Sequence, residues 1–170
     1  MSTERFDMRS TSGTMLRKRI GAAVICGVGC ALAIWIMEAS SSLIRYPLFA
    51  IPFATSIVLV IGSPRAKPAQ PRALIGGHVM SALAGFVLLA LFGAHGWVAA
   101  LAVGIGVGVM MLTDTFHPPA GINPLLIVTN NLPWTFMLVP VLAGALLLAV
   151  FAFVWHRITQ PGSWPYREEA

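Results

Sequence analysis

Two proline-rich segments hold most of the residues in this sequence that could do chemistry. The first, 62–78, reads GSPRAKPAQPRALIGGH and joins three prolines and three cations to a Gly-Gly-His triplet. The second, 113–124, reads TDTFHPPAGINP and combines an acid, a histidine, an asparagine and two consecutive prolines. Proline withholds a backbone donor and disfavours helix in the residue before it. Both segments should therefore interrupt helices and expose polar groups at the interruptions.

The titratable residues of these segments suggest anion or proton chemistry rather than a metal centre. Asp114 is the only acid between Glu38 and Glu168, and a carboxylate at a bilayer centre costs about 2.5–3.5 kcal/mol. We expect Asp114 at an edge, either solvated or paired with His117 or the cations of 62–78. His78 and His117 could donate hydrogen bonds or carry protons, or could simply be packing residues. With Asp114 they form an acceptable ligand set, but no tight spacing supports a metal, so we predict none.

The stretch after Pro119 is apolar from Ala120 to Val128 and could fold back as a short helix. Free N–H groups at the start of such a helix, at the positive end of its dipole, would favour a small anion. The alternative is an ordinary loop with a hydrophobic anchor. Irregular backbone at membrane depth is tolerated only where protein buries it or water reaches it.

The elements that must position these residues are membrane helices. Of the 170 residues, 57% are hydrophobic and 10% charged, against roughly 45–50% and about 25% in soluble domains. Five apolar runs approach the roughly 20 residues that a spanning helix needs: 20–37, 46–62, 74–93, 97–113 and 134–156. Each run is apolar at odd and even positions alike, whereas a β-barrel strand alternates apolar and polar residues, so a β-barrel is disfavoured. We predict an all-α, polytopic transmembrane bundle of about five spans, or four if one run is re-entrant or interfacial.

The cations lie in short flanks between the runs, which is a topology signal and not a nucleic-acid surface. The N-terminal flank holds five Lys or Arg and 63–73 holds three, whereas 38–45 holds one and 93–96 none. The positive-inside rule therefore places the N-terminus and 63–73 in the cytoplasm, and five spans would put Arg157 outside. We divide the chain into a flexible cytoplasmic N-terminus (1–16), one transmembrane domain (17–157) and a short polar tail (158–170).

Small residues in the fourth run suggest helix packing. Gly104 and Gly108, with Gly106 between them, form a bare face that allows close helix approach; lining a pathway is the alternative. Five short helices barely enclose a pore, so we expect a homo-oligomer, most simply a dimer, packed partly through this face. Residues 82–92 and 141–151 also match at seven positions. If they are duplicated units, two spans per unit would make the copies parallel.

At the two proline-rich segments the sequence resembles the HPP family of integral membrane proteins, named for the triplet found here at His117-Pro118-Pro119. The resemblance rests on HPPAG at 117–121 and QPRALIGGH at 70–78, and it covers about 45–156. It implies about four transmembrane helices and, because some members are associated with nitrite transport, an anion substrate. Ile122 and Asn123 replace the small residues expected after HPPAG. The motif residues carried over are Gln70, Pro71, Arg72, Gly76, Gly77, His78, His117, Pro118, Pro119, Ala120 and Gly121.

We therefore predict a transporter or channel for a small monovalent anion, nitrite above others, in a bacterial inner membrane. A non-transporting assembly or anchoring protein is the alternative. Arg72, with Arg65 and Lys67, would attract the anion to the cytoplasmic mouth. No Gly-x-Ser-x-Gly, Walker or Cys-x-x-Cys motif occurs, so we predict neither an enzyme nor a cofactor. The candidate pathway residues are Arg72, Gly76, Gly77, His78, Asp114, His117, Pro118, Pro119, Ala120, Gly121 and Asn123.

Overall fold

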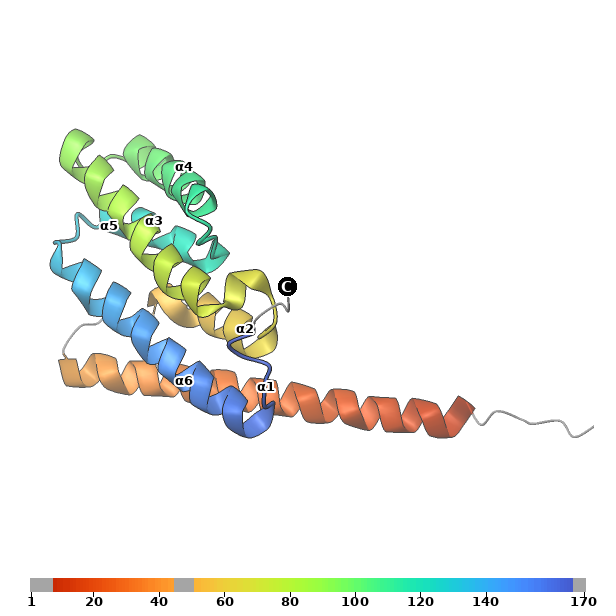
Figure 1. Ribbon diagram of the computed structural model, residues 1–170. Coiled ribbons are helices and arrows are strands. Elements are labelled where there is room, and N and C mark those ends of the chain that lie inside the picture. The colour runs from red at the N-terminus through yellow and green to blue at the C-terminus, as the bar shows by residue number, and fades with distance from the viewer. Residues whose placement is uncertain (1–7, 45–50, 167–170) are drawn as a thin grey trace, which may run out of the picture.

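The computed structural model describes residues 8–44 and 51–166, and all regular structure in these ranges is helical (Figure 1). The helices are α1 (Met8–Ile44), α2 (Ala54–Gly62), α3 (Pro71–Phe92), α4 (Gly96–Leu112), α5 (Ile122–Thr129) and α6 (Ala143–Thr159). Short helical turns precede four of them: η1 (Ile51–Phe53), η2 (Lys67–Ala69), η3 (Pro118–Gly121) and η4 (Met137–Leu142). The predicted all-α bundle is confirmed.

Each predicted apolar run contains a helix within the described residues. Among the described residues, three helical stretches are long and apolar enough to cross a membrane: Thr14–Leu43, Pro71–Phe92 and Met137–Thr159. Two apolar helices are shorter, Ile51–Gly62 and Gly96–Leu112, and positions 46–50 of the second run lie outside the described residues. The proline-rich segments interrupt the helices as predicted, and α5 is the short helix expected after Pro119.

Helix α6 ends where α3 begins. Nε1 of Trp164 donates a 2.7 Å hydrogen bond to the carbonyl of Ala69, and Nε2 of His156 donates one of 3.1 Å to the carbonyl of Val60. The end of α6 therefore lies beside the 63–70 connection, at the same end of the bundle. This corrects the expectation that five spans would put Arg157 at the opposite end.

The reason for the correction is α5, which adds a reversal of the chain. It begins beside the middle of α3, where Asn123 contacts His78, and Val128 near its end packs with Leu88 of α3 and Val98 of α4. The chain then turns and returns through α6. As a result, the similar stretches 82–92 and 141–151 lie on helices of opposite direction (Figure 1). The expectation of parallel copies is wrong.

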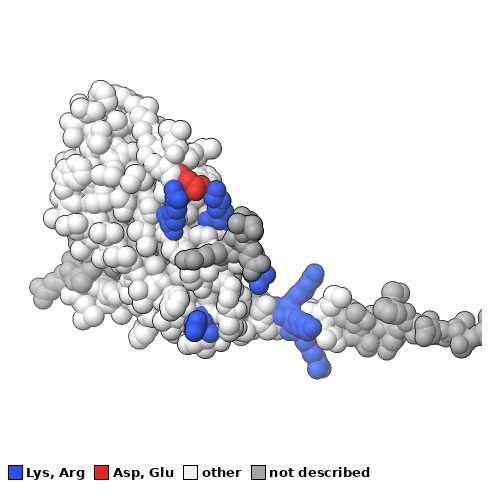
Figure 2. All heavy atoms as spheres, viewed as in Figure 1, with Lys and Arg blue, Asp and Glu red and all other residues white. Residues whose placement is uncertain are grey.

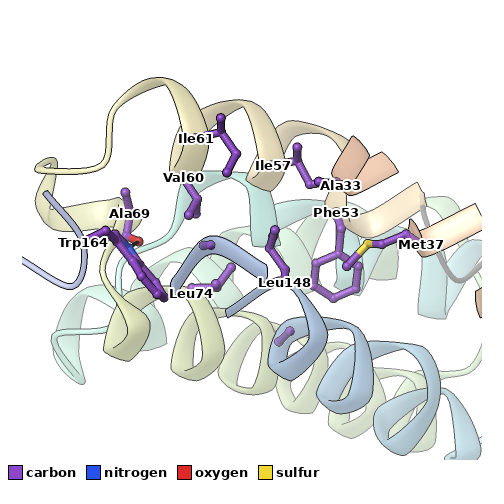
Figure 3. Packing of buried hydrophobic residues seen from close by; sticks show 12 residues of the cluster. Ala33, Met37, Phe53, Ile57, Val60, Ile61, Ala69, Leu74, Leu148 and Trp164 are labelled. Atoms are coloured by element: carbon purple, nitrogen blue, oxygen red, sulfur yellow. Dashed lines mark hydrogen bonds between the residues drawn. The ribbon is translucent and has the colours of Figure 1, made fainter. Parts of the chain in front are cut away.

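The largest apolar core joins α1, α2 and α6 to the start of α3 (Figure 3). Phe53 packs against Gly144 of α6, where an added Cβ would collide with its ring. Met37 of α1 and Leu148 of α6 lie near the same ring, and all three of these large side chains are buried. The short α2 is thus held between two longer helices by burial of apolar surface, worth roughly 25 cal/mol per Å².

Helix α5 is held between α3 and α4 by glycines on both. A Cβ on Gly85 of α3 would lie 2.8 Å from Cα of Pro124, and one on Gly106 of α4 would lie 3.5 Å from Cγ of the same proline. Gly106 of the predicted glycine face therefore faces inward. Gly104 and Gly108 meet nothing within 4 Å, so their use in a homo-oligomer stays a prediction.

Helix α1 continues beyond the rest of the bundle (Figure 1). No proline interrupts 8–44, and the helix begins at Met8, so residues 8–16 of the expected flexible N-terminus are helical. A Cβ on Gly29 would lie 2.6 Å from the Trp155 ring, which places this part of α1 beside the end of α6. The expected polar tail is likewise partly packed, because Trp164 is buried.

Candidate functional site

The two proline-rich segments lie directly against each other. A Cβ on Gly77 would be 2.6 Å from Cβ of His117 and 2.8 Å from the carbonyl oxygen of Thr115, and one on Gly76 would be 2.6 Å from Cγ2 of Thr115. Ordinary carbon contacts are about 3.5–4.0 Å. The Gly-Gly pair is therefore what allows the second segment to lie on the first turn of α3.

A charged cleft opens where the segments meet. Nζ of Lys67 lies 2.8 Å from Oδ1 of Asp114, and Nη1 of Arg72 lies 3.9 Å from Oδ2. Arg72 also donates a 3.0 Å hydrogen bond to the carbonyl of Thr113. On the face drawn in Figure 2, acidic atoms accordingly lie between basic ones. Of the partners expected for Asp114, the structure shows the cations of 62–78, Lys67 and Arg72.

The cleft has a volume of about 410 Å³, and Pro68, Lys67, Arg72 and Asp114 are among its lining residues. The hydrogen bond from Lys67, with its charge, holds the pKa of the Asp114 carboxyl below its ordinary value, and Arg72 adds to this effect. Two cations beside one ionised carboxylate leave one net positive charge. The cleft can therefore attract a small anion, although its carboxylate weakens the attraction.

His117 leads inward from the cleft. Its side chain is completely buried, with Nδ1 2.6 Å from the carbonyl oxygen of Pro68 and Nε2 2.9 Å from Oγ of Ser56. A carbonyl can only accept, so Nδ1 carries the hydrogen and donates it to Pro68. A buried ring without an acidic partner is neutral. Nε2 of His117 is therefore an acceptor, and the Ser56 hydroxyl donates to it.

His78 completes the row from the other side of Ser56. Nε2 of His78 lies 2.9 Å from Oγ of Ser56. Since the one hydroxyl hydrogen of Ser56 is used on His117, Ser56 accepts from Nε2–H of His78. Nδ1 of His78 is then an acceptor, and Nδ2 of Asn123, 3.0 Å away, donates to it.

The orientation of the Asn123 amide follows from its other neighbours. Nδ2 also lies 3.1 Å from the carbonyl oxygen of His78, which can only accept, and 3.1 Å from Oγ of Ser81. Ser81 in turn donates to the carbonyl of Ala120 at 2.8 Å. Oδ1 of Asn123 is buried and has no hydrogen-bond partner. An unpaired buried acceptor costs about 1–3 kcal/mol.

These residues form one row of hydrogen bonds with a single direction, which we call the polar chain. It consists of Asn123, His78, Ser56, His117 and the carbonyl of Pro68, and every donor points toward Pro68 and the cleft. All four of its polar side chains are completely buried. Two short helices supply one end and the middle, since Asn123 lies on α5 and Ser56 on α2, and η2 supplies Pro68 at the other end.

The backbone N–H groups at η3 were expected to be free to bind an anion, and the structure shows otherwise. Pro118 and Pro119 carry no N–H, the N–H of Ala120 donates to the carbonyl of His117 at 2.9 Å, and that of Ile122 points to carbonyls of the same turn. The expectation that the start of this short helix offers free donors to an anion is therefore wrong for Ala120 and Ile122. A Cβ on Gly121 would meet nothing within 4 Å.

Sequence reasoning missed Ser56, Ser81 and Pro68. Ser81 is the only polar residue between His78 and Gly93, and this isolation within an apolar helix was a usable signal. The rings of His78 and His117 lie 5.2 Å apart, but Asp114 pairs with Lys67 instead of joining them. Across 8–44 and 51–166 no group of three His, Cys, Asp or Glu could hold a metal ion.

An all-helical membrane bundle with a buried polar chain under a basic cleft defines the class, an integral membrane protein. The chain belongs to the HPP family, whose transmembrane region matches residues 15–165. Over 121 residues, 66% of this chain, it is 38% and 34% identical to two transmembrane proteins of Dictyostelium discoideum. The alignments cover 42% and 39% of those relatives, so the chain spans about two fifths of their length. No solved structure matches it.

Proposed function

We propose that this HPP-family protein is a transporter or channel for a small monovalent anion, with nitrite as the expected substrate. The observation that carries the proposal is the continuity between the basic cleft and the polar chain. Pro68 lines the cleft, and its carbonyl accepts the hydrogen bond from buried His117. Polar groups that are buried among membrane helices are costly and commonly mark a substrate or ion pathway.

The charge distribution supports an anion as substrate. Lys67 and Arg72 lie at the cleft, and both side chains are mostly exposed. Exposed cations raise the local concentration of anions, and salt screens this effect over about 8–10 Å. Uptake that depends on these cations should therefore fall as ionic strength rises.

Orientation and location form part of the proposal. Arg65, Lys67, Arg72 and Arg157 are all at the end of the bundle where α6 meets the 63–70 connection. The positive-inside rule then assigns this end to the cytoplasm, together with the N-terminus, in a bacterial inner membrane. The cleft is the cytoplasmic mouth, and no enzymatic activity is proposed.

A non-transporting assembly role is the second candidate, and the outward glycine face supports it. Gly104 and Gly108 of α4 have open space before them, and only 17% of the most apolar part of α1 is buried. Both surfaces suit another membrane helix. A homodimer through α4 is compatible with either function.

Nitrite uptake into proteoliposomes tests the proposal. We expect uptake by the intact protein above that of protein-free liposomes, and a fall of about tenfold in Arg72→Gln at low ionic strength. Arg157→Gln is the matched control, because it removes a cation from the same end without touching the cleft residues. Each variant is first checked for a single peak in size-exclusion chromatography. Uptake equal to that of empty liposomes would exclude transport of nitrite and favour the assembly role.

A further inference from the structure

We infer that His78, Ser56 and His117 form a proton relay, and that the anion crosses the membrane together with a proton. This inference rests on the proposed function, because it names the second ion that the same site moves. Asn123 and Pro68 bound the relay at its two ends.

The geometry meets the requirements of a relay. A relay group must take up a proton at one atom and release another, which imidazole and hydroxyl groups do. A carbonyl has no proton to release, and an amide does not readily give up its N–H proton. The links from His78 to Ser56 and from Ser56 to His117 are both 2.9 Å. These distances are within the ordinary range for such hydrogen bonds, and no water is needed to complete the connection.

The transfer balances as follows. The hydrogen bond from Nδ2 of Asn123 to Nδ1 of His78 first breaks. A proton then binds Nδ1 of His78, and the Nε2 proton of the same ring moves to Oγ of Ser56. The original hydroxyl proton of Ser56 moves to Nε2 of His117, whose Nδ1 proton then leaves past Pro68 into the cleft. One proton has entered at His78 and one has left at the cleft, and no electrons are exchanged. The chain returns to its starting state when the rings and the hydroxyl reorient.

Oδ1 of Asn123 marks where the proton arrives. This oxygen is buried, lacks a partner, and belongs to the amide whose Nδ2 contacts Nδ1 of His78. It would accept a hydrogen bond from a water molecule or from the hydroxyl of a protonated anion. Either guest would thereby be held beside the ring nitrogen that takes up the proton.

The two other histidines of the described residues lie outside the polar chain. His156 is bonded to Val60 and takes no part in the polar chain, and His95 is exposed at the start of α4. Lys67, Arg72 and Asp114 line the cleft together with Pro68, whose carbonyl accepts the hydrogen bond from His117. Because the cleft carries net positive charge, a proton that reaches it is not retained there and passes on to water.

The alternative is that the polar chain only holds helices together, and substitutions at Ser56 separate the two roles. Ser56→Ala removes the link between the rings, whereas Ser56→Thr keeps a hydroxyl there. Thr55→Ala is the matched control, because it deletes a neighbouring hydroxyl of the same helix that is exposed. A purely structural role would lower stability in Ser56→Ala without changing the ratio of protons to nitrite.

The test measures both ions in one preparation of proteoliposomes that contain a pH-sensitive dye, after subtraction of the flux in protein-free liposomes. We expect one proton per nitrite in the intact protein and in Thr55→Ala and Ser56→Thr. In Ser56→Ala we expect the ratio of protons to nitrite to fall at least tenfold. Nitrite that enters the intact protein without protons, or an unchanged ratio in Ser56→Ala, would overturn the relay while leaving nitrite transport in place.

Two further outcomes separate the relay from the proposed function. Proton movement without nitrite, lost in Ser56→Ala, would support the relay and reject nitrite as substrate. Movement of neither ion would reject both. In each case ¹⁵N NMR of histidine-labelled protein in lipid tests the direction of the chain: we expect hydrogen on Nδ1 of His117 and on Nε2 of His78. Hydrogen on Nε2 of His117 instead would contradict the relay as drawn.

Discussion

Replacing Gly77 with alanine tests the feature on which the site depends, the direct contact between the two proline-rich segments. The new Cβ would lie 2.6 Å from Cβ of His117 and 2.8 Å from the carbonyl oxygen of Thr115. Neither is the free end of a flexible side chain. The second segment must therefore move away by about 1 Å to restore ordinary contact distances, and this movement stretches the 2.6 Å bond from His117 to Pro68.

The change in the free energy of unfolding combines two destabilising contributions and one stabilising contribution. Overpacking costs about 1–3 kcal/mol, and weakening a hydrogen bond adds about 1 kcal/mol. Alanine in a helix is favoured over glycine by about 1 kcal/mol. The net loss is about 1–3 kcal/mol, and for a chain of this size each kcal/mol lowers Tm by about 2–4 °C. We expect Tm to fall by about 2–12 °C.

The assay is thermal unfolding in detergent, followed by tryptophan fluorescence, with Gly104→Ala as control. Gly104 lies in a helix of the same bundle but has open space before it, so the control should unfold at the normal temperature or slightly above it. If Gly77→Ala and Gly104→Ala unfolded at the same temperature, the two segments would not be in contact, and the cleft and polar chain would be wrong.

Three further predictions concern other parts of the bundle. Asp114→Asn removes the carboxylate beside Lys67; because both groups are exposed, Tm should stay the same, and nitrite uptake at low ionic strength should rise about two- to threefold. Gly62→Cys, in a Cys30→Ser background, should form a disulfide with Cys26 under mild oxidation, because its Cβ would lie 3.5 Å from that sulfur; no reducible mobility shift on a gel would contradict the position of α1. Trp164→Phe loses the hydrogen bond to Ala69, about 1 kcal/mol, and should lower Tm by about 2–4 °C.

The helices and their interruptions could be predicted because both depend on local sequence. Continuous apolar runs give membrane helices, and prolines break them wherever they occur. These inferences need no knowledge of how distant segments pack. The sequence left the environment of Asp114 open between solvent, His117 and the cations of 62–78, and the structure shows the pairing with the cations.

The polar chain could not be predicted, because it depends on contacts between distant positions. Ser56 is 22 residues from His78 and 61 from His117, and a serine within an apolar helix gives no sign of which residue it contacts. The opposite directions of 82–92 and 141–151 were missed for a related reason. An eight-residue helix such as α5 is too short to be counted as a crossing from composition, yet it reverses every element after it.

The uncharged interior has a consequence for how the protein responds to membrane voltage. The buried polar side chains among the described residues are serine, threonine, asparagine and histidine, with no Asp, Glu, Lys or Arg. Moving one elementary charge across a potential of 100 mV changes its energy by about 2.3 kcal/mol. The neutral resting interior has no fixed charge on which the potential could act. Depolarisation by itself should therefore leave the helices where they are, unlike in proteins that carry gating arginines across the bilayer.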